Sequence, residues 1–135
     1  MTRWTCTFAA LALAACASTP AEPQSRRLDK KIFDDVPAPE KALYRSESGE
    51  SFSFTTKGFR CGRFLFDYSG SEEEAVRFFK TWMQKPPYSW SLTDENRDVE
   101  GSTELSFVKS ADECTIDVDR KAEFVEIAVR INYHK

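Results

Sequence analysis

The sequence predicts a two-layer α+β domain, in which one helix packs on one face of an antiparallel sheet of about five strands. Several short segments alternate apolar and polar residues, which is the period of a half-buried strand. One segment repeats its apolar residues at helical spacing instead. The links between these segments are short, and short links join antiparallel rather than parallel strands.

The domain is expected to begin with an extended segment, residues 33–39. Val36 and Ala38 each precede a proline, and a residue in that position is disfavoured in a helix. We therefore expect this segment to lie on the domain as a first strand or an arm.

Residues 52–56 and 59–68 predict a hairpin, because both alternate and only two residues separate them. The parity of the apolar positions in the second segment changes at Gly62. The positions on the two sides of this change are Phe59 and Cys61, then Phe64, Phe66 and Tyr68. We expect a β-bulge at Gly62, because an extra residue would bring both sets to one face.

The helix is predicted from Ser71 onward. Ser71 can cap its N-terminus, and Glu74 completes the pattern of a capping box. Pro86 and Pro87 end it. The apolar residues that share one helical face are Ala75, Val76, Phe79, Trp82 and Met83.

Alternation returns after the helix, in residues 89–93, 104–109, 114–118 and 125–133. The last of these is the longest, with apolar residues at every second position. We take these segments as about three strands, which gives the order β-β-α-β-β-β.

Residues 1–15 have the features of a targeting segment. A short basic start is followed by an apolar run, residues 4–15, that carries no charge. A membrane span needs about 20 apolar residues, so this run is too short to cross a bilayer. A basic start, a brief apolar core and small residues at its end are typical of a secretory signal peptide.

The end of this run, Leu13-Ala14-Ala15-Cys16, resembles the lipobox of bacterial lipoproteins. The resemblance implies a lipid on the Cys16 thiol, cleavage before Cys16 and acylation of the new N-terminus. Several acyl chains give stable membrane anchoring, whereas a single chain gives only marginal binding. Ala17, in place of Asp, favours sorting to the periplasmic side of the outer membrane. The alternative is an ordinary secretory signal, with Cys16 incidental.

The mature chain divides into a tether and one domain. Residues 16–31 contain few apolar side chains and are expected to be a flexible tether. Residues 32–135 are enough for a single domain. The formal net charge of −3 becomes −4 when Arg3 leaves with the leader, and an acidic balance argues against a nucleic-acid partner. The basic residues of the tether either touch anionic lipid or are simply solvated: Arg26, Arg27, Lys30 and Lys31.

Four further features lie along the mature chain: Asp35-Val36-Pro37-x-Pro39, Tyr68-x-Gly70, the Trp82-Met83 pair in the helix, and the segment that contains Trp90. In these the chain resembles a class of small envelope lipoproteins to which no activity is assigned. The motifs are structural, so the resemblance implies no catalytic residue.

Cys61 and Cys114 are the two cysteines of the expected domain. An exported protein occupies an oxidising compartment, where two thiols often pair, so a Cys61–Cys114 disulfide is expected. Two separate buried thiols are the alternative. Neither cysteine has partner ligands at zinc-like spacing, so we expect no metal there.

The sequence contains no recognisable catalytic set. The single histidine, His134, lies beside the C-terminus, and no serine or cysteine has a positioned base. The sequence has neither a phosphate-binding glycine loop nor an HExxH motif. Three acidic groups are interpreted as solvated or capping residues rather than a calcium site: Asp34 with Asp35, residues 72–74, and Asp117 with Asp119. We expect no enzyme, no cofactor and no metal.

Tyr88 and Trp90, close to Trp82, form the candidate binding patch for a glycan or a peptide. The alternative is that these rings belong to the core. Two functions remain open. One is a non-catalytic envelope module that docks on a membrane-associated partner through an open sheet face or edge. The other is a small-ligand carrier or enzyme with a pocket between helix and sheet.

Overall fold

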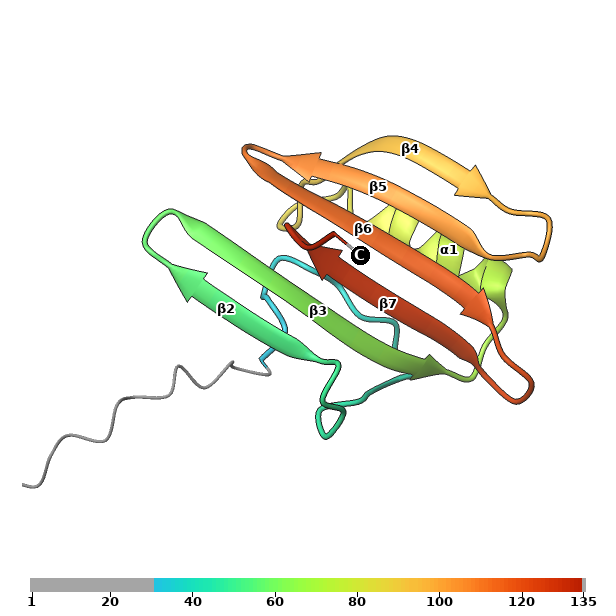
Figure 1. The fold of residues 1–135 in the computed structure, drawn as a ribbon. Helices are drawn as coiled ribbons and strands as arrows, with labels where there is room; N and C mark the ends of the chain where they lie inside the picture. The colour runs from blue at the N-terminus through green and yellow to red at the C-terminus, as the bar shows by residue number, and fades with distance from the viewer. Residues whose placement is uncertain (1–30, 135) are drawn as a thin grey trace, which may run out of the picture.

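The protein is described by a computed structural model that covers residues 31–134 (Figure 1). The predicted signal peptide, Cys16 and residues 16–30 of the tether lie outside the described residues. The elements in chain order are β1 (Ala42–Tyr44), β2 (Phe52–Thr56), β3 (Phe59–Tyr68), α1 (Glu72–Trp82), β4 (Ser91–Arg97), β5 (Thr103–Lys109), β6 (Asp112–Arg120) and β7 (Val125–Ile131).

The structure confirms a broadly α+β fold with an antiparallel sheet and one helix, but the sheet has seven strands rather than about five. Each of the four alternating segments after the helix forms a strand of its own, where the prediction allowed for three. The short strand β1 was not predicted, because three residues are too few to reveal an alternation.

The sheet runs in the order β1-β3-β7-β6-β5-β4, and β2 also pairs with β3. β1 and β2 lie along the same side of β3, one beside Tyr68 and the other beside Phe59. The two ends of the sheet therefore differ. The hairpin end carries the β2–β3 and β5–β6 turns, the last turn of α1 and the end of β7, whereas the far end carries the β4–β5 and β6–β7 turns and the start of α1 (Figure 1).

The face of the sheet that packs against α1, the covered face, holds the hydrophobic core. The helix contributes Ala75, Phe79 and Met83, all fully buried. Burial of a side chain such as Phe79 stabilises the fold by about 1.5–3 kcal/mol. The helix begins as predicted, because the Ser71 hydroxyl accepts a hydrogen bond from the Glu74 N–H at 3.1 Å. The buried sheet residues of this face are Phe64, Phe66, Tyr68, Leu105, Phe107, Cys114, Ile116, Val118, Val125, Ile127, Val129 and Ile131.

The segment before β1 lies on the covered face as an arm, as predicted, but it is not extended throughout, because the Val36 N–H donates to the Phe33 carbonyl oxygen at 3.1 Å and closes a turn. The ring of Phe33 meets the ring of Phe64 edge-on at 5.3 Å between centroids. Val36 is buried in the same core. The arm therefore covers apolar surface near β3, while α1 covers the neighbouring strands (Figure 1).

The predicted β-bulge at Gly62 is wrong, because the pairing of β3 with β2 and β7 runs through this position without a shift. The glycine has a packing reason instead. A Cβ at Gly62 would lie 2.9 Å from Cζ of Phe64 and 3.1 Å from Cε2 of Phe33. Gly62 thus makes room for the arm, and Phe59 and Cys61 alternate onto the opposite face, called here the open face.

Candidate functional site

The candidate patch of Tyr88 and Trp90 is not an exposed surface. Trp90 is 2% exposed and packs in the core, and its indole N–H donates to the Asp35 carbonyl oxygen at 2.8 Å. Tyr88 is half-buried against the same core. Trp90 is therefore a core residue, which was the stated alternative to the binding patch, and its hydrogen bond fixes the arm to the domain. Trp82, at the end of α1, is the exposed member of the group.

Cys61 and Cys114 are both free thiols, so the expected disulfide is not formed. Strand β7 lies between β3 and β6, which puts the two backbones about 10 Å apart, beyond the roughly 7 Å that a disulfide can bridge. Cys114 lies in the core of the covered face, while Cys61 is on the open face. Burial raises the pKa of both thiols, so both are protonated at neutral pH.

A polar cluster holds the arm at the hairpin end. The Asp35 carboxylate accepts two hydrogen bonds from the Arg60 guanidinium, each 2.7 Å long, and one from Lys109 at 3.1 Å. Arg60 also donates to Asp112 at 2.8 Å. Burial acts to raise the pKa of Asp35, but the hydrogen bonds from Arg60 and Lys109 outweigh it and lower the pKa. Asp35 is thus ionised and holds the arm against β3, a contact called here the Asp35 latch. It is not the solvated residue that was predicted.

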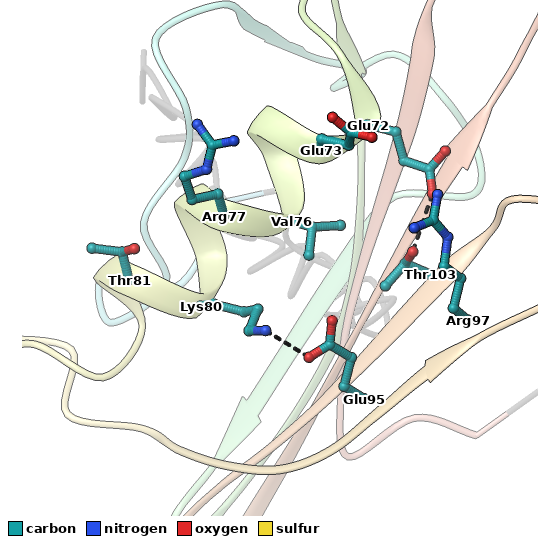
Figure 2. Close-up of a pocket in the computed structure, with 9 residues that line it drawn as sticks. All are labelled: Glu72, Glu73, Val76, Arg77, Lys80, Thr81, Glu95, Arg97 and Thr103. Carbon is teal, nitrogen blue, oxygen red and sulfur yellow. Dashed lines mark hydrogen bonds and ion pairs between the residues drawn. The ribbon is translucent and has the colours of Figure 1, made fainter.

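A groove runs between α1 and the edge of the sheet at β4 (Figure 2). Its volume is about 390 Å³. Lys80 reaches across it to Glu95 at 2.7 Å, and the buried Glu72 accepts a hydrogen bond from the Thr103 hydroxyl at 3.1 Å. The residues that line the groove are Glu72, Glu73, Val76, Arg77, Lys80, Thr81, Glu95, Arg97 and Thr103. Only one of them is aliphatic, whereas ligand pockets are mostly apolar.

The open face carries two clusters in which one arginine serves two carboxylates. The Arg45 guanidinium donates to Asp67, with its Nε at 2.7 Å, and to Glu126 at 2.9 Å. The Arg130 guanidinium donates to Asp117 at 2.8 Å and to Glu104 at 3.4 Å. We call these the Arg45 and Arg130 triads. Each triad has one more negative than positive charge.

Two side chains of the Arg130 triad, Arg130 and Asp117, are largely buried on the open face. The Arg130 side chain is 7% exposed, and its Nε has no hydrogen-bond partner among the described residues. A hollow of about 100 Å³ opens between the two triads. The residues that line it are Arg63, Ser102, Asp117, Asp119, Glu126 and Ala128. Three carboxylates and the Arg63 guanidinium thus line this hollow, and one of the carboxylates, Asp119, is paired with Lys121 at 2.6 Å.

Within residues 31–134, no group of three or more His, Cys, Asp or Glu side chains is arranged to hold a metal ion. In the same part of the chain, no helix is long and apolar enough to cross a membrane. His134 is exposed, with its Nε2 3.7 Å from a Glu113 carboxylate oxygen.

Comparisons with protein families, with curated proteins and with solved structures find no match to this chain.

The two triads were not predicted from the sequence. Asp117 lies opposite the core, as its alternation indicated, but it is bound by Arg130 rather than solvated. The alternation of residues 125–131 places Glu126 and Arg130 on the same face, which was the available signal. Asp117 lies on the adjacent strand of the β6–β7 hairpin, whereas the placing of Asp67 and Glu104 depends on the strand order, which the sequence does not reveal.

Proposed function

We propose that the mature chain is a lipid-anchored, non-catalytic binding module of the cell envelope, and that its open face docks a basic surface of a protein partner. The observation that carries the docking face is the pair of arginine triads on a sheet face that neither α1 nor the arm covers. The anchor rests on the lipobox at Cys16.

The charge of the open face favours a basic partner. The two triads together hold four carboxylates and two arginines, and Arg63 brings a third cation to the hollow between them, so this part of the open face has a net negative formal charge. The side chains of Arg130 and Asp117 are already ordered and mostly buried, at 7% and 16% exposure. Binding would therefore cost little side-chain entropy, which is one of the main penalties of association. Complementary charge also speeds encounter and selects the partner.

The open face is a better docking surface than the edge of the sheet at β4. Strand β4 is exposed and rich in charged residues, and its pairing with β5 shifts between Leu92 and Asp94. Charges and bulges on an edge strand oppose the addition of another strand. Recognition by strand addition is thus disfavoured at this edge.

The anchor is tested by processing and fractionation. We expect the mature protein to carry an acylated Cys16 by intact mass, to accumulate as precursor with globomycin, and to leave the membrane fraction in Cys16→Ser. A serine variant that stays with membranes, processed normally despite the inhibitor, would show that the anchor is not lipid on Cys16.

The docking face is tested by photo-crosslinking in the intact envelope. A photo-reactive residue replaces Thr115, which pairs with Arg130 on the open face, and a matched one replaces Arg77 on the helix. We expect one protein adduct from position 115 and none of that mass from position 77. Glu104→Lys should abolish the adduct, whereas Glu104→Gln should only weaken it. An adduct that survives Glu104→Lys would contradict docking by charge.

A second candidate is a small-ligand carrier that uses the groove beside α1. Its volume lies within the usual range of ligand sites, about 300–1,000 Å³, and Arg97 forms no ion pair with any described residue. Native mass spectrometry of protein purified from the envelope tests it. A stoichiometric small ligand that is lost in Arg97→Ala supports the carrier, and its absence from the wild type rejects it.

A further inference from the structure

We infer that the hairpin end of the domain rests on the anionic lipid surface in which Cys16 is anchored, through aromatic and lysine side chains gathered there. This inference deepens the proposed function and rests on its lipid anchor. It adds an orientation, in which the hairpin end contacts the bilayer and neither face of the sheet lies against the bilayer.

Exposed apolar side chains concentrate at the hairpin end. Phe59, directly after the β2–β3 turn, is 50% exposed, and Trp82, the last residue of α1, is 45% exposed. Val108, beside the β5–β6 turn, and Tyr133, just after β7, are each 37% exposed. Phe59, Trp82 and Val108 come from β3, α1 and β5, and Tyr133 follows β7, with its ring against that of Phe52 in β2. The ends of β7 and α1 and the β2–β3 and β5–β6 turns lie at this end of the sheet (Figure 1). Among the described residues, the other large exposed apolar side chains are Leu43 and Val99, toward the far end.

Lysines accompany these rings. Lys57 is exposed at the β2–β3 turn, and the Lys85 ammonium lies 4.8 Å from the centroid of the Trp82 ring. Aromatic rings and lysines side by side are typical of the membrane interface, where the ring enters the headgroup region and the ammonium meets phosphate.

Two acidic residues near this end are paired with Arg60, but Glu113 there is exposed, and exposed acids also lie at the far end. Arg60 bridges Asp35 and Asp112, so two carboxylates close to the hairpin end already have a cation. The far-end turns and the start of α1 carry exposed acids, among them Glu73, Asp98, Glu100 and Glu123. Lys57 and Lys85 would therefore attract the hairpin end to an anionic bilayer, whereas the far end carries exposed acids together with Arg97, Arg120 and Lys121.

The chain also enters the domain near this end. The described residues begin at Lys31, and within a few residues Phe33 and Asp35 contact Phe64 and Arg60 of β3. Between Cys16 and Lys31 lie residues 17–30, which span roughly 50 Å at most when fully extended. A tether of this length keeps the surface at high effective concentration, so a weak contact is enough to orient the domain.

The sequence of the tether also contains the basic residues Arg26, Arg27 and Lys30. Each basic residue close to an anionic surface strengthens binding about fivefold. Reversal of the charge at one lysine is therefore expected to weaken docking on the order of tenfold or more.

Fluorescence quenching by brominated lipid tests the orientation. The mature chain with Cys16→Ser and an N-terminal hexahistidine tag is bound to nickel-chelating vesicles of phosphatidylethanolamine and phosphatidylglycerol with brominated acyl chains. The mature chain has two tryptophans, because Trp4 leaves with the leader, and Trp90 is buried. We expect the bromines to quench a component of the emission that disappears in Trp82→Phe.

Two matched variants decide the result. Lys57→Glu combined with Phe59→Asp should reduce the quenching on the order of tenfold, while Leu43→Asp at the far end should leave it unchanged. Absence of quenching in the wild type, or equal loss in Leu43→Asp, would overturn the inference. A protein adduct from a photo-reactive residue at position 59, without quenching on vesicles, would also overturn it and assign the patch to a protein instead.

The docking result is independent of native lipidation, because the tag replaces the acyl chains. If Cys16 is not acylated by mass but the bromines quench the emission, the proposed anchor is wrong and the lipid contact of the hairpin end is supported. Acylated Cys16 without quenching would keep the anchor and remove the orientation.

Discussion

The two faces of the sheet are built from the same strands, yet different forces hold them. On the covered face, Phe64, Ile116 and Val129 are fully buried against α1 and the arm. On the open face, the same strands present Asp67, Asp117 and Arg130, which are joined by ion pairs. Apolar burial gives a large net stabilisation, whereas a half-buried ion pair gives little, because desolvation offsets its attraction. The open-face charges are thus expected to add little stability, which agrees with the proposal that they serve recognition.

The largest effect is expected on the covered face. Phe79→Ala in α1 should lower the free energy of unfolding by about 3–5 kcal/mol, because it removes a fully buried ring and leaves a cavity. Urea unfolding followed by circular dichroism measures this loss. A loss below about 1 kcal/mol would mean that α1 does not cover the sheet as described.

Asp35→Asn should come next, since it breaks the latch between the arm and β3. The loss at neutral pH is expected to be about 2–3 kcal/mol, because charge-assisted hydrogen bonds from Arg60 and Lys109 weaken together.

The pH dependence of this variant gives a second test. The folded-state pKa of Asp35 is lowered, so its contribution is complete above the unfolded pKa of about 3.9 and is lost as the pH falls through the folded value. The difference between wild type and Asp35→Asn should hold from pH 7 to pH 5 and shrink below about pH 4. A difference that grows as the pH falls would contradict the latch.

Gly62→Ala should cost about 1–3 kcal/mol, because the new methyl group would press on the rings of Phe64 and Phe33. Gly49→Ala is the matched control, since no atom lies within 4 Å of the Cβ position there. The control should change the unfolding free energy by less than about 0.5 kcal/mol. Equal effects at the two glycines would show that the arm does not pack at Gly62.

The smallest effect is expected on the open face. Glu104→Gln should change the unfolding free energy by less than about 1 kcal/mol, because the Glu104 side chain is 47% exposed and Arg130 keeps Asp117. Chemical unfolding at low and high salt measures it. A loss as large as that of Phe79→Ala would contradict the division between the two faces.

Sequence periodicity predicted the helix, its cap and the covered face, because these follow from local spacing. It could not predict that β7, the last strand, inserts between β3 and β6. This insertion separates Cys61 from Cys114 and brings Asp67 next to Glu126, the two carboxylates of the Arg45 triad. The arm explains two further positions, since its ring needs the space at Gly62 and its backbone accepts the indole N–H of Trp90. Long-range pairing, not local propensity, decided each of these positions.

The most direct test of the central claim compares one variant from each face in both assays. Ile116→Val on the covered face should cost about 0.5–1.5 kcal/mol of stability and leave the position-115 crosslink of the folded protein unchanged. Glu104→Lys on the open face should remove the crosslink while the protein remains folded, with a smaller loss of stability than Phe79→Ala. If Glu104→Lys keeps the crosslink and Ile116→Val removes it, the open face is not the binding surface.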